Sequence, residues 1–177
     1  MRGRISAIAV RVAIGVLSLA LVVTGAQPSA AAAMTGAARG QGTFQYAGTV
    51  PMDFVFEAVT HADGRASGTF RHTFTFGGYS YDYRGRVTCL SVDTVNGRAW
   101  IGGVLTSVQT DDPTSTQRAG DDAWFRVLDQ GGTGPDRSTA MGFVGAIPSS
   151  AAYCALRLWP AGDARTWPVS DGKITVR

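Results

Sequence analysis

The sequence predicts an all-β protein: a single β-sandwich or β-barrel of roughly eight to nine short antiparallel strands, preceded by a signal peptide. Apolar and polar residues alternate over several short runs, and Gly-rich turn signals separate these runs. Beyond Val23 no segment has a sustained helical period. Short alternating strands at regular spacing are typical of sandwiches and of barrels, and the pattern leaves the choice between the two open.

Residues 1–33 have the organisation of a secretory signal peptide. A short basic start precedes an apolar run over Ala13–Val23, and small residues follow as far as Ala33. This order predicts Sec-type export with cleavage near Ala33, because the apolar run is shorter than the about 20 residues of a membrane span. The alternative is an uncleaved N-terminal anchor. We therefore expect a secreted protein that is free of the membrane after cleavage, with a flexible leader at 34–41 and a single β-domain at 42–177.

Removal of the signal peptide changes the charge of the chain. The whole sequence carries 16 Lys and Arg against 13 Asp and Glu, a formal net charge of +3. Three basic residues, Arg2, Arg4 and Arg11, precede Ala33, and every acidic residue follows it, so 13 basic and 13 acidic residues remain. A nucleic-acid-binding protein is expected to present a basic surface. The balanced charge therefore argues against nucleic acid as a partner.

The densest aromatic pattern surrounds Gly77-Gly78, a two-residue loop that favours a tight hairpin. Aromatic rings and one histidine occupy alternate positions on both sides of the loop. The alternation favours a buried aromatic face over an exposed one and places Arg71, Asp82 and Arg84 on the opposite, polar face. The loop predicts a register that pairs Phe76 with Tyr79, Phe74 with Tyr81, His72 with Tyr83, Thr73 with Asp82 and Arg71 with Arg84.

The remaining strands follow from the same signals. Over Met52–Thr60 the apolar residues alternate with Asp53 and Glu57, which is the period of a half-buried strand. Gly85 and Gly102-Gly103 indicate bulges or close backbone approaches. The other strands are predicted at Thr43–Ala47, Ala66–Phe76, Tyr79–Arg84, Val87–Val92, Ala99–Val108 after an Asn96-Gly97 turn, Asp122–Asp129, Ser138–Gly145, Ala152–Trp159 and Trp167–Arg177, the last with a turn at Asp171-Gly172.

Cys89 and Cys154 are the two cysteines of the chain. In an exported protein an even pair predicts a disulfide, and two buried free thiols are the alternative. The enclosed loop is long, so the bridge would stabilise the fold by about 4 kcal/mol in the chain-entropy model.

The order of several short motifs resembles a group of secreted actinobacterial proteins, most of them uncharacterised. The resemblance covers most of 43–136, and its motifs are structural, so it implies a bacterial, exported, β-rich domain and no particular activity. The matching features are F-x-F at Phe54–Phe56, the turn Asp63-Gly64, V-T-C-L at Val87–Leu90, Asn96-Gly97, I-G-G at Ile101–Gly103 and F-R-V-x-D at Phe125–Asp129.

We predict no catalytic residue, metal site or cofactor, since the sequence contains no H-x-x-x-H, C-x-x-C, G-x-S-x-G or phosphate-loop motif. His72 is interpreted as a packed residue of the aromatic face. Asp53, Glu57 and Asp82 are interpreted as solvated carboxylates rather than as a glycosidase pair. The acidic loop from Asp111 to Asp122 is interpreted as solvated rather than as a calcium site.

The binding candidates on the central hairpin are Arg71, Asp82, Arg84 and Tyr81, and Trp124 is a further aromatic candidate. We expect a non-enzymatic β-domain that binds an extracellular partner or a polysaccharide. One alternative is a small β-barrel that carries an apolar ligand in its aromatic interior. The other is a secreted hydrolase, which would require a cleft that converges on such residues as Glu57, Asp82 or His72.

Overall fold

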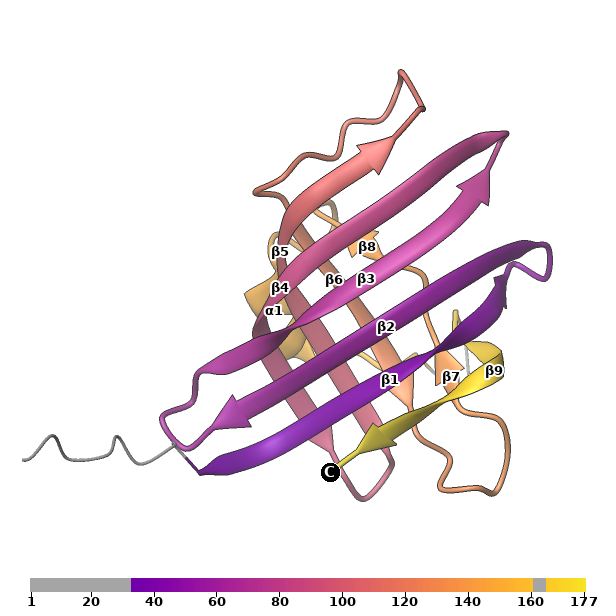
Figure 1. Cartoon of the computed structure of the whole chain (residues 1–177). Helices are drawn as coiled ribbons and strands as arrows, with labels where there is room; N and C mark the ends of the chain where they lie inside the picture. The colour runs from indigo at the N-terminus through magenta and orange to yellow at the C-terminus, as the bar shows by residue number, and fades with distance from the viewer. Residues whose placement is uncertain (1–32, 161–164) are drawn as a thin grey trace, which may run out of the picture. The chain divides into compact units, whose positions relative to one another are not determined.

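One antiparallel sheet, closed into a ring, is the framework of the protein (Figure 1). The computed structural model describes residues 33–160 and 165–177, so the predicted signal peptide lies outside the described residues except for Ala33. The elements are β1 (Met34–Tyr46), β2 (Val50–His61), β3 (Ala66–Phe76), β4 (Tyr79–Asp93), β5 (Arg98–Thr110), β6 (Asp122–Leu128), β7 (Arg137–Ser138), β8 (Gly142–Phe143), α1 (Ser150–Leu156) and β9 (Trp167–Val176).

Strand pairing runs from neighbour to neighbour and returns to its start. Strands β1 to β5 pair in sequence order, β5 also pairs with β6, and the ring continues through β7 and β9 back to β1. Strand β8 pairs with the other end of β6. The all-β prediction is confirmed, and so is the expected number of strands. The continuous ring makes the sheet barrel-like.

Side chains that point inward at alternate strand positions form the core of the ring. Rings from separate strands meet near its centre, where the Phe125 ring centroid lies 5.2 Å from that of Phe56 and 5.8 Å from that of Phe70. The alternation predicted for β2 is confirmed, because its apolar positions are buried and its acidic positions are exposed: Met52, Phe54, Phe56 and Ala58 inside, Asp53 and Glu57 outside.

The hairpin of β3 and β4 has the predicted register in all five cross-strand pairs. Its inward face changes from buried to exposed along its length. Phe70 and His72 are buried, whereas Phe76 and Tyr79, beside the Gly77-Gly78 loop, are 56% and 40% exposed. The aromatic row is therefore core over most of its length. It reaches the surface at the end of the ring that carries the β1–β2 and β3–β4 turns, which we call the mouth (Figure 1).

Two glycines allow close approaches within the sheet, as the sequence predicts. The pairing register of β4 with β5 shifts between Arg84 and Gly85, and a Cβ atom at Gly85 would lie 2.0 Å from the Phe70 ring. A Cβ atom at Gly103 would lie 2.0 Å from the carbonyl oxygen of Arg86. A side chain at either position would force the neighbouring group to move.

The first strand begins earlier than predicted. Residues 34–41, which we expect from the sequence to form a flexible leader, are the first half of β1. They pair with β2 on one side and, from Ala38 onward, with β9 on the other. The prediction is wrong because small and polar residues carry no strand signal of their own, whereas two neighbouring strands satisfy their backbone hydrogen bonds.

The C-terminal third differs most from the prediction. The segment Ala152–Trp159, predicted as a strand, contains the end of helix α1, whose first turn is capped by Ser149 through a hydrogen bond from the backbone N–H of Ala152. Only the two-residue strands β7 and β8 form within Arg137–Phe143. Asp171-Gly172 lies inside β9, next to a register shift, rather than at a turn.

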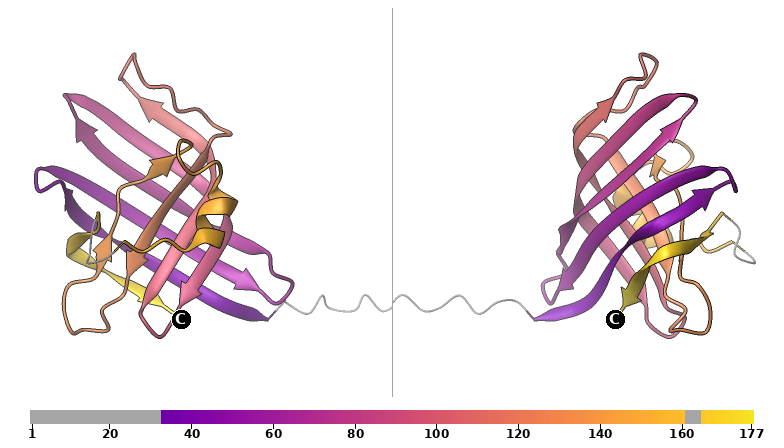
Figure 2. Two further views of the ribbon diagram at one scale, coloured as in Figure 1. Left: turned by 180° about the vertical axis from the view of Figure 1, so that it is seen from behind. Right: turned by 45° about the vertical axis from the view of Figure 1, so that its right-hand side comes forward.

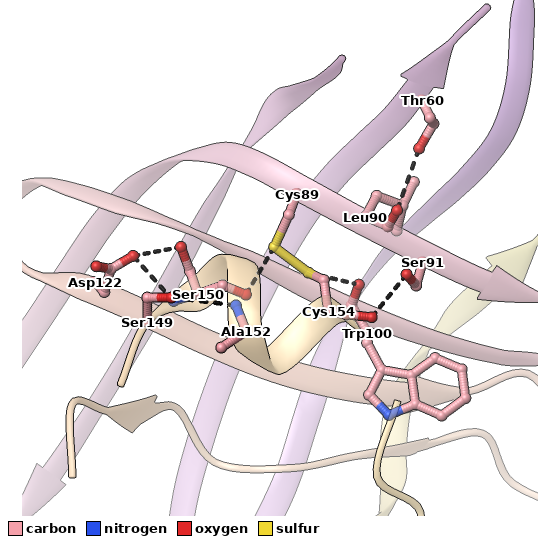
Figure 3. Close-up of a disulfide and its surroundings, with 10 residues drawn as sticks. All are labelled: Thr60, Cys89, Leu90, Ser91, Trp100, Asp122, Ser149, Ser150, Ala152 and Cys154. Carbon is pink, nitrogen blue, oxygen red and sulfur yellow. Dashed lines mark hydrogen bonds between the residues drawn. A yellow bond between two sulfur atoms is a disulfide. The ribbon is translucent and has the colours of Figure 1, made fainter. Parts of the chain in front are cut away.

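Helix α1 lies on the outer face of the sheet, against β4, β5 and β6 (Figure 2). A disulfide between Cys89 of β4 and Cys154 of α1 confirms the predicted bridge (Figure 3). The bridge holds a helix rather than the expected C-terminal strand. Polar contacts add to it: the Ser150 hydroxyl donates to Asp122 of β6, and the Ser91 hydroxyl donates to the carbonyl oxygen of Cys154 at 2.8 Å.

Candidate functional site

A row of exposed side chains crosses the outer face of the ring, because the antiparallel register aligns them. Gln41 of β1 pairs with Lys173 of β9 and with Val55 of β2. Val55 pairs in turn with Arg71 of β3, and Arg71 with Arg84 of β4. All five residues are exposed. We call Lys173, Gln41, Val55, Arg71 and Arg84 the basic row.

Asp82 holds the two arginines of the basic row in position. Its carboxylate accepts hydrogen bonds from Arg71 at 2.8 and 2.9 Å and from the Arg84 Nη2 atom at 2.9 Å. These bonds, from Arg71 first and Arg84 second, lower the pKa of Asp82 to about 2. The side chain of Asp82 is 16% exposed, whereas those of Arg71 and Arg84 are 47% and 49% exposed. The guanidinium groups are therefore fixed at one edge and open to solvent elsewhere.

The basic row crosses a groove on this outer face. The groove has a volume of about 780 Å³ and extends from β9 to Thr106 of β5. Because it spans six adjacent strands, which lie about 4.8 Å apart, it is roughly 24 Å across. A second depression of about 360 Å³ shares Arg39, Glu57, Thr175 and Arg177 with it. We call the two connected depressions the outer groove.

Basic side chains outnumber acidic ones in the outer groove. Arg39 and Lys173 form no salt bridge with any residue that the structure describes. Toward the mouth, the next row of outward residues is acidic and contains Asp171, Asp53 and Asp82. An anion in the groove would meet cations on its floor and carboxylates along one border. The charged residues that line the larger depression are Arg39, Arg71, Arg84, Lys173 and Arg177 against Glu57.

The structure separates the predicted binding candidates. Arg71 and Arg84 line the outer groove, and Asp82 lies beside them on its acidic border. Tyr81 lies on the inner face near the mouth, where its ring is partly buried and its hydroxyl donates to the Asp112 carboxylate at 2.7 Å. Three of the candidates therefore belong to one surface, and Tyr81 belongs to another.

Trp124 belongs to neither surface. It is 6% exposed and packs in a cluster next to α1, where its ring stacks on that of Tyr153 with 5.6 Å between centroids. The sequence pattern does not single out Arg39 or Lys173, because it predicts a flexible leader around Arg39 and a turn at Asp171-Gly172, next to Lys173. Their place in the groove depends on strand pairing, because β1 brings Arg39 next to β2 and β9, and β9 brings Lys173 next to β1.

The residues that a hydrolase would use lie apart. His72 is inside the ring, where both ring nitrogens lack a hydrogen-bond partner among the described residues and burial lowers its pKa to about 3. Glu57 and Asp82 lie on the outside. Asp53 and Glu57 are four positions apart on one strand, about 13 Å at roughly 3.3 Å per residue, which exceeds the about 5–9.5 Å between glycosidase carboxylates. Asp53 and Asp82 lie closer together, about 9.6 Å apart across two strand spacings of about 4.8 Å, with Thr73 of β3 between them. His72 is on the opposite face of the sheet from all three carboxylates, so the four residues do not converge on one cleft.

Two carboxylates of the acidic loop between β5 and β6 accept hydrogen bonds from backbone N–H groups. Asp111 accepts from the backbone N–H of Ser80 and Asp121 from that of Arg118, each at 2.7 Å. Throughout the described part of the chain, no group of three or more His, Cys, Asp or Glu side chains is placed to hold a metal ion. In the same part of the chain, no helix has the length and apolar composition needed to cross a membrane.

Fold and site together define a closed antiparallel sheet with a cationic groove on its outer face. Comparisons with protein-family models, with curated proteins and with solved structures find no match to this chain. The resemblance to secreted actinobacterial proteins therefore stays a prediction, and the residues of the groove themselves carry the functional proposal.

Proposed function

We propose that this protein is a secreted, non-enzymatic binding protein whose outer groove holds an acidic polysaccharide. The observation that supports the proposal most directly is the charge of the groove lining, which has five basic side chains and one acidic side chain, Glu57. Arg and Lys bind carboxylate, sulfate and phosphate groups through charge-assisted hydrogen bonds. Because Asp82 already orients Arg71 and Arg84, less side-chain freedom is lost when a ligand binds them.

The groove suits an acidic chain better than a neutral one. Neutral sugars are held largely by stacking on exposed aromatic faces. The two aromatic residues of the groove lining, Phe56 and Phe70, are each 3% exposed and belong to the core. Recognition therefore falls to the charged and polar side chains, and a groove of roughly 24 Å leaves room for several sugar residues in an extended chain.

The acidic border argues against duplex nucleic acid as the ligand. Proteins that bind duplex nucleic acid neutralise several phosphates with a basic patch or stripe. Here the carboxylates of Asp53 and Asp171 run beside the basic row. A narrow chain that carries its anionic groups in one line fits along the basic row, whereas a wide polyanion would be repelled by the carboxylates of the acidic border.

Binding of defined polymers to the purified protein tests the proposal. We would measure affinity for polygalacturonate, for neutral dextran and for duplex DNA by calorimetry at several salt concentrations. We expect binding to polygalacturonate that weakens as salt rises, since counterions compete with the ligand, and much weaker binding to the other two polymers. Preferential binding of dextran would contradict the charge argument, and preferential binding of DNA would identify a nucleic-acid-binding protein instead.

Charge-neutral variants locate the site. Arg39→Gln and Lys173→Gln remove groove cations that form no salt bridge within the described residues. Arg65→Gln removes the same charge from the β2–β3 turn, where Arg65 is 84% exposed and lies outside the groove lining. We expect the Arg39→Gln/Lys173→Gln double variant to lose about tenfold or more in affinity, near 1.4 kcal/mol, and Arg65→Gln to bind like the parent. Equal losses in all variants would reject the groove as the site.

A further inference from the structure

The mouth of the ring carries a second site of different chemistry, which does not depend on the proposed function of the outer groove. Here the inward-facing aromatic side chains reach solvent, and the residues at this end of the sheet line a pocket of about 220 Å³. No charged side chain is among its lining residues. They come from β1, β2, β3, β4 and the segment around β8: Tyr46, Val50, Met52, Phe74, Phe76, Tyr83, Ala140, Met141 and Phe143.

Aromatic rings set the shape of this mouth pocket. The Tyr83 ring meets that of Phe74 edge-on at 5.9 Å and that of Phe143 edge-on at 5.5 Å between centroids. The ring of Tyr81, which is not part of the pocket lining, stacks on the ring of Phe74 with 4.7 Å between centroids. Edge-to-face partners leave ring faces and edges available to a further aromatic group. Phe76 at the rim is 56% exposed, so this side of the apolar lining is open to solvent.

Size restricts what the pocket can hold. Its volume of about 220 Å³ is that of roughly seven water molecules at about 30 Å³ each. Pockets that bury a whole drug-sized ligand are larger, about 300–1,000 Å³. One compact ring system fits, and any larger part of a ligand would stay outside, above the rim. Further along the inward faces of β2 and β3, Phe54 and His72 are buried in the core.

Charge near the rim selects against anions. The Asp112 carboxylate accepts the Tyr81 hydroxyl at 2.7 Å, and Tyr81 stacks on the pocket residue Phe74. The ring of Tyr81 therefore stands between the ionised Asp112 carboxylate and Phe74 of the pocket lining. A negatively charged ligand would meet its repulsion, whereas a neutral aromatic group would not.

We propose that the mouth pocket binds a neutral, compact aromatic group, either a small aromatic molecule or the aromatic end of a larger one. Affinity comes from burial of apolar surface and from ring contacts, since the only polar side-chain groups of the lining are the hydroxyls of Tyr46 and Tyr83. The site is distinct from the outer groove in position and in chemistry, because no residue lines both.

A neutral fluorescent probe, 1-aminoanthracene, tests the proposal on the purified protein, with the anionic probe 1-anilinonaphthalene-8-sulfonate as comparison. We expect saturable binding of the neutral probe at one site and weaker binding of the anionic one. Ala140→Phe fills the pocket, and we expect it to lower the affinity by about tenfold or more, since burial supplies the binding energy. Val144→Phe adds the same ring at a 61% exposed position outside the lining and should leave binding unchanged.

Fold measurements and two further variants separate loss of binding from loss of structure. Far-UV circular dichroism and melting temperature establish that Ala140→Phe is folded. Phe76→Ala trims a rim residue that is 56% exposed, so it should weaken probe binding without loss of the fold. The Arg39→Gln/Lys173→Gln variant should bind the probe like the parent, which separates this site from the groove. Absence of saturable binding, or equal affinity in folded Ala140→Phe, would overturn the proposal.

Discussion

Acid should destabilise this protein through one residue, His72, well before its carboxylates are protonated. The side chain is fully buried, with ring centroids 4.9 Å from Phe125 and 6.2 Å from Phe54. Neither ring nitrogen has a hydrogen-bond partner among the described residues. Burial among apolar rings disfavours the charged imidazolium and lowers the pKa of His72 from 6.5 to about 3.

The sign and the size of the effect follow from proton linkage. Between pH 6.5 and about pH 3 the unfolded chain binds a proton at His72 and the folded chain does not. The free energy of unfolding is therefore at its full value above pH 6.5 and decreases as the pH falls toward the folded pKa. At about pH 4.5, two pH units below 6.5, the loss is about 2.7 kcal/mol at about 1.36 kcal/mol per unit.

Urea unfolding at about pH 7 and about pH 4.5 measures this loss directly, and a variant assigns it to His72. His72→Leu places an apolar side chain in the same core, so its absolute stability can differ but its pH dependence should be smaller by about 2.7 kcal/mol. His61→Gln is the control, since His61 is partly exposed and bonded to Ser67. Carboxylates with lowered pKa values, such as Asp82, lose most of their contribution below pH 3.8, the pKa in the unfolded chain. Parallel pH dependence in the parent and His72→Leu would refute the reasoning.

Two further predictions concern the framework of the sheet. Replacing Cys89 and Cys154 by Ala should lower the free energy of unfolding by about 4 kcal/mol, because the bridge closes a loop of 65 residues; a denaturation midpoint unaffected by reductant would contradict this. Gly85→Ala should cost about 1–3 kcal/mol, because its Cβ atom would lie 2.0 Å from the Phe70 ring. Thermal unfolding measures this loss, with Gly145→Ala as the control because its Cβ atom would meet nothing closer than 3.8 Å. Equal effects of the two changes on stability would show that the Phe70 ring moves away from the new Cβ atom at no cost.

Local features of the fold were predictable from the sequence because neighbouring residues determine them. The Gly77-Gly78 loop sets the register of β3 with β4, and the register in turn brings Asp82 between Arg71 and Arg84. The close approach at Gly103 follows from two consecutive glycines in a strand. In each case the physical cause lies within a few residues of the signal.

Features that depend on distant partners were not predictable in this way. The segment 34–41 is a strand only because β2 and β9 flank it, and β9 is more than a hundred residues away in sequence. Helix α1 was mistaken for a strand, because its alternating apolar residues outweigh a weak Ser149 cap signal in a helix of 7 residues. The same helix covers Trp124, so this predicted ligand contact is a buried residue that packs against Tyr153.

The short strand β7 gives the ring a weak seam. It joins β6 through two residue pairs and β9 through two more, whereas β1 and β2 pair along their whole length. The Arg137 side chain reinforces the seam with hydrogen bonds to the Thr166 hydroxyl at 3.0 Å and carbonyl at 2.8 Å. The carboxylates of Asp136 and Asp129 also hold the seam, because they accept hydrogen bonds from the backbone N–H groups of Ile174 at 2.7 Å and Val176 at 3.1 Å. Opening there would free the edges of β6 and β9, and free edges are templates for intermolecular strand pairing. We expect amide exchange and local unfolding to begin at this seam, since its strand pairing is the shortest of the ring.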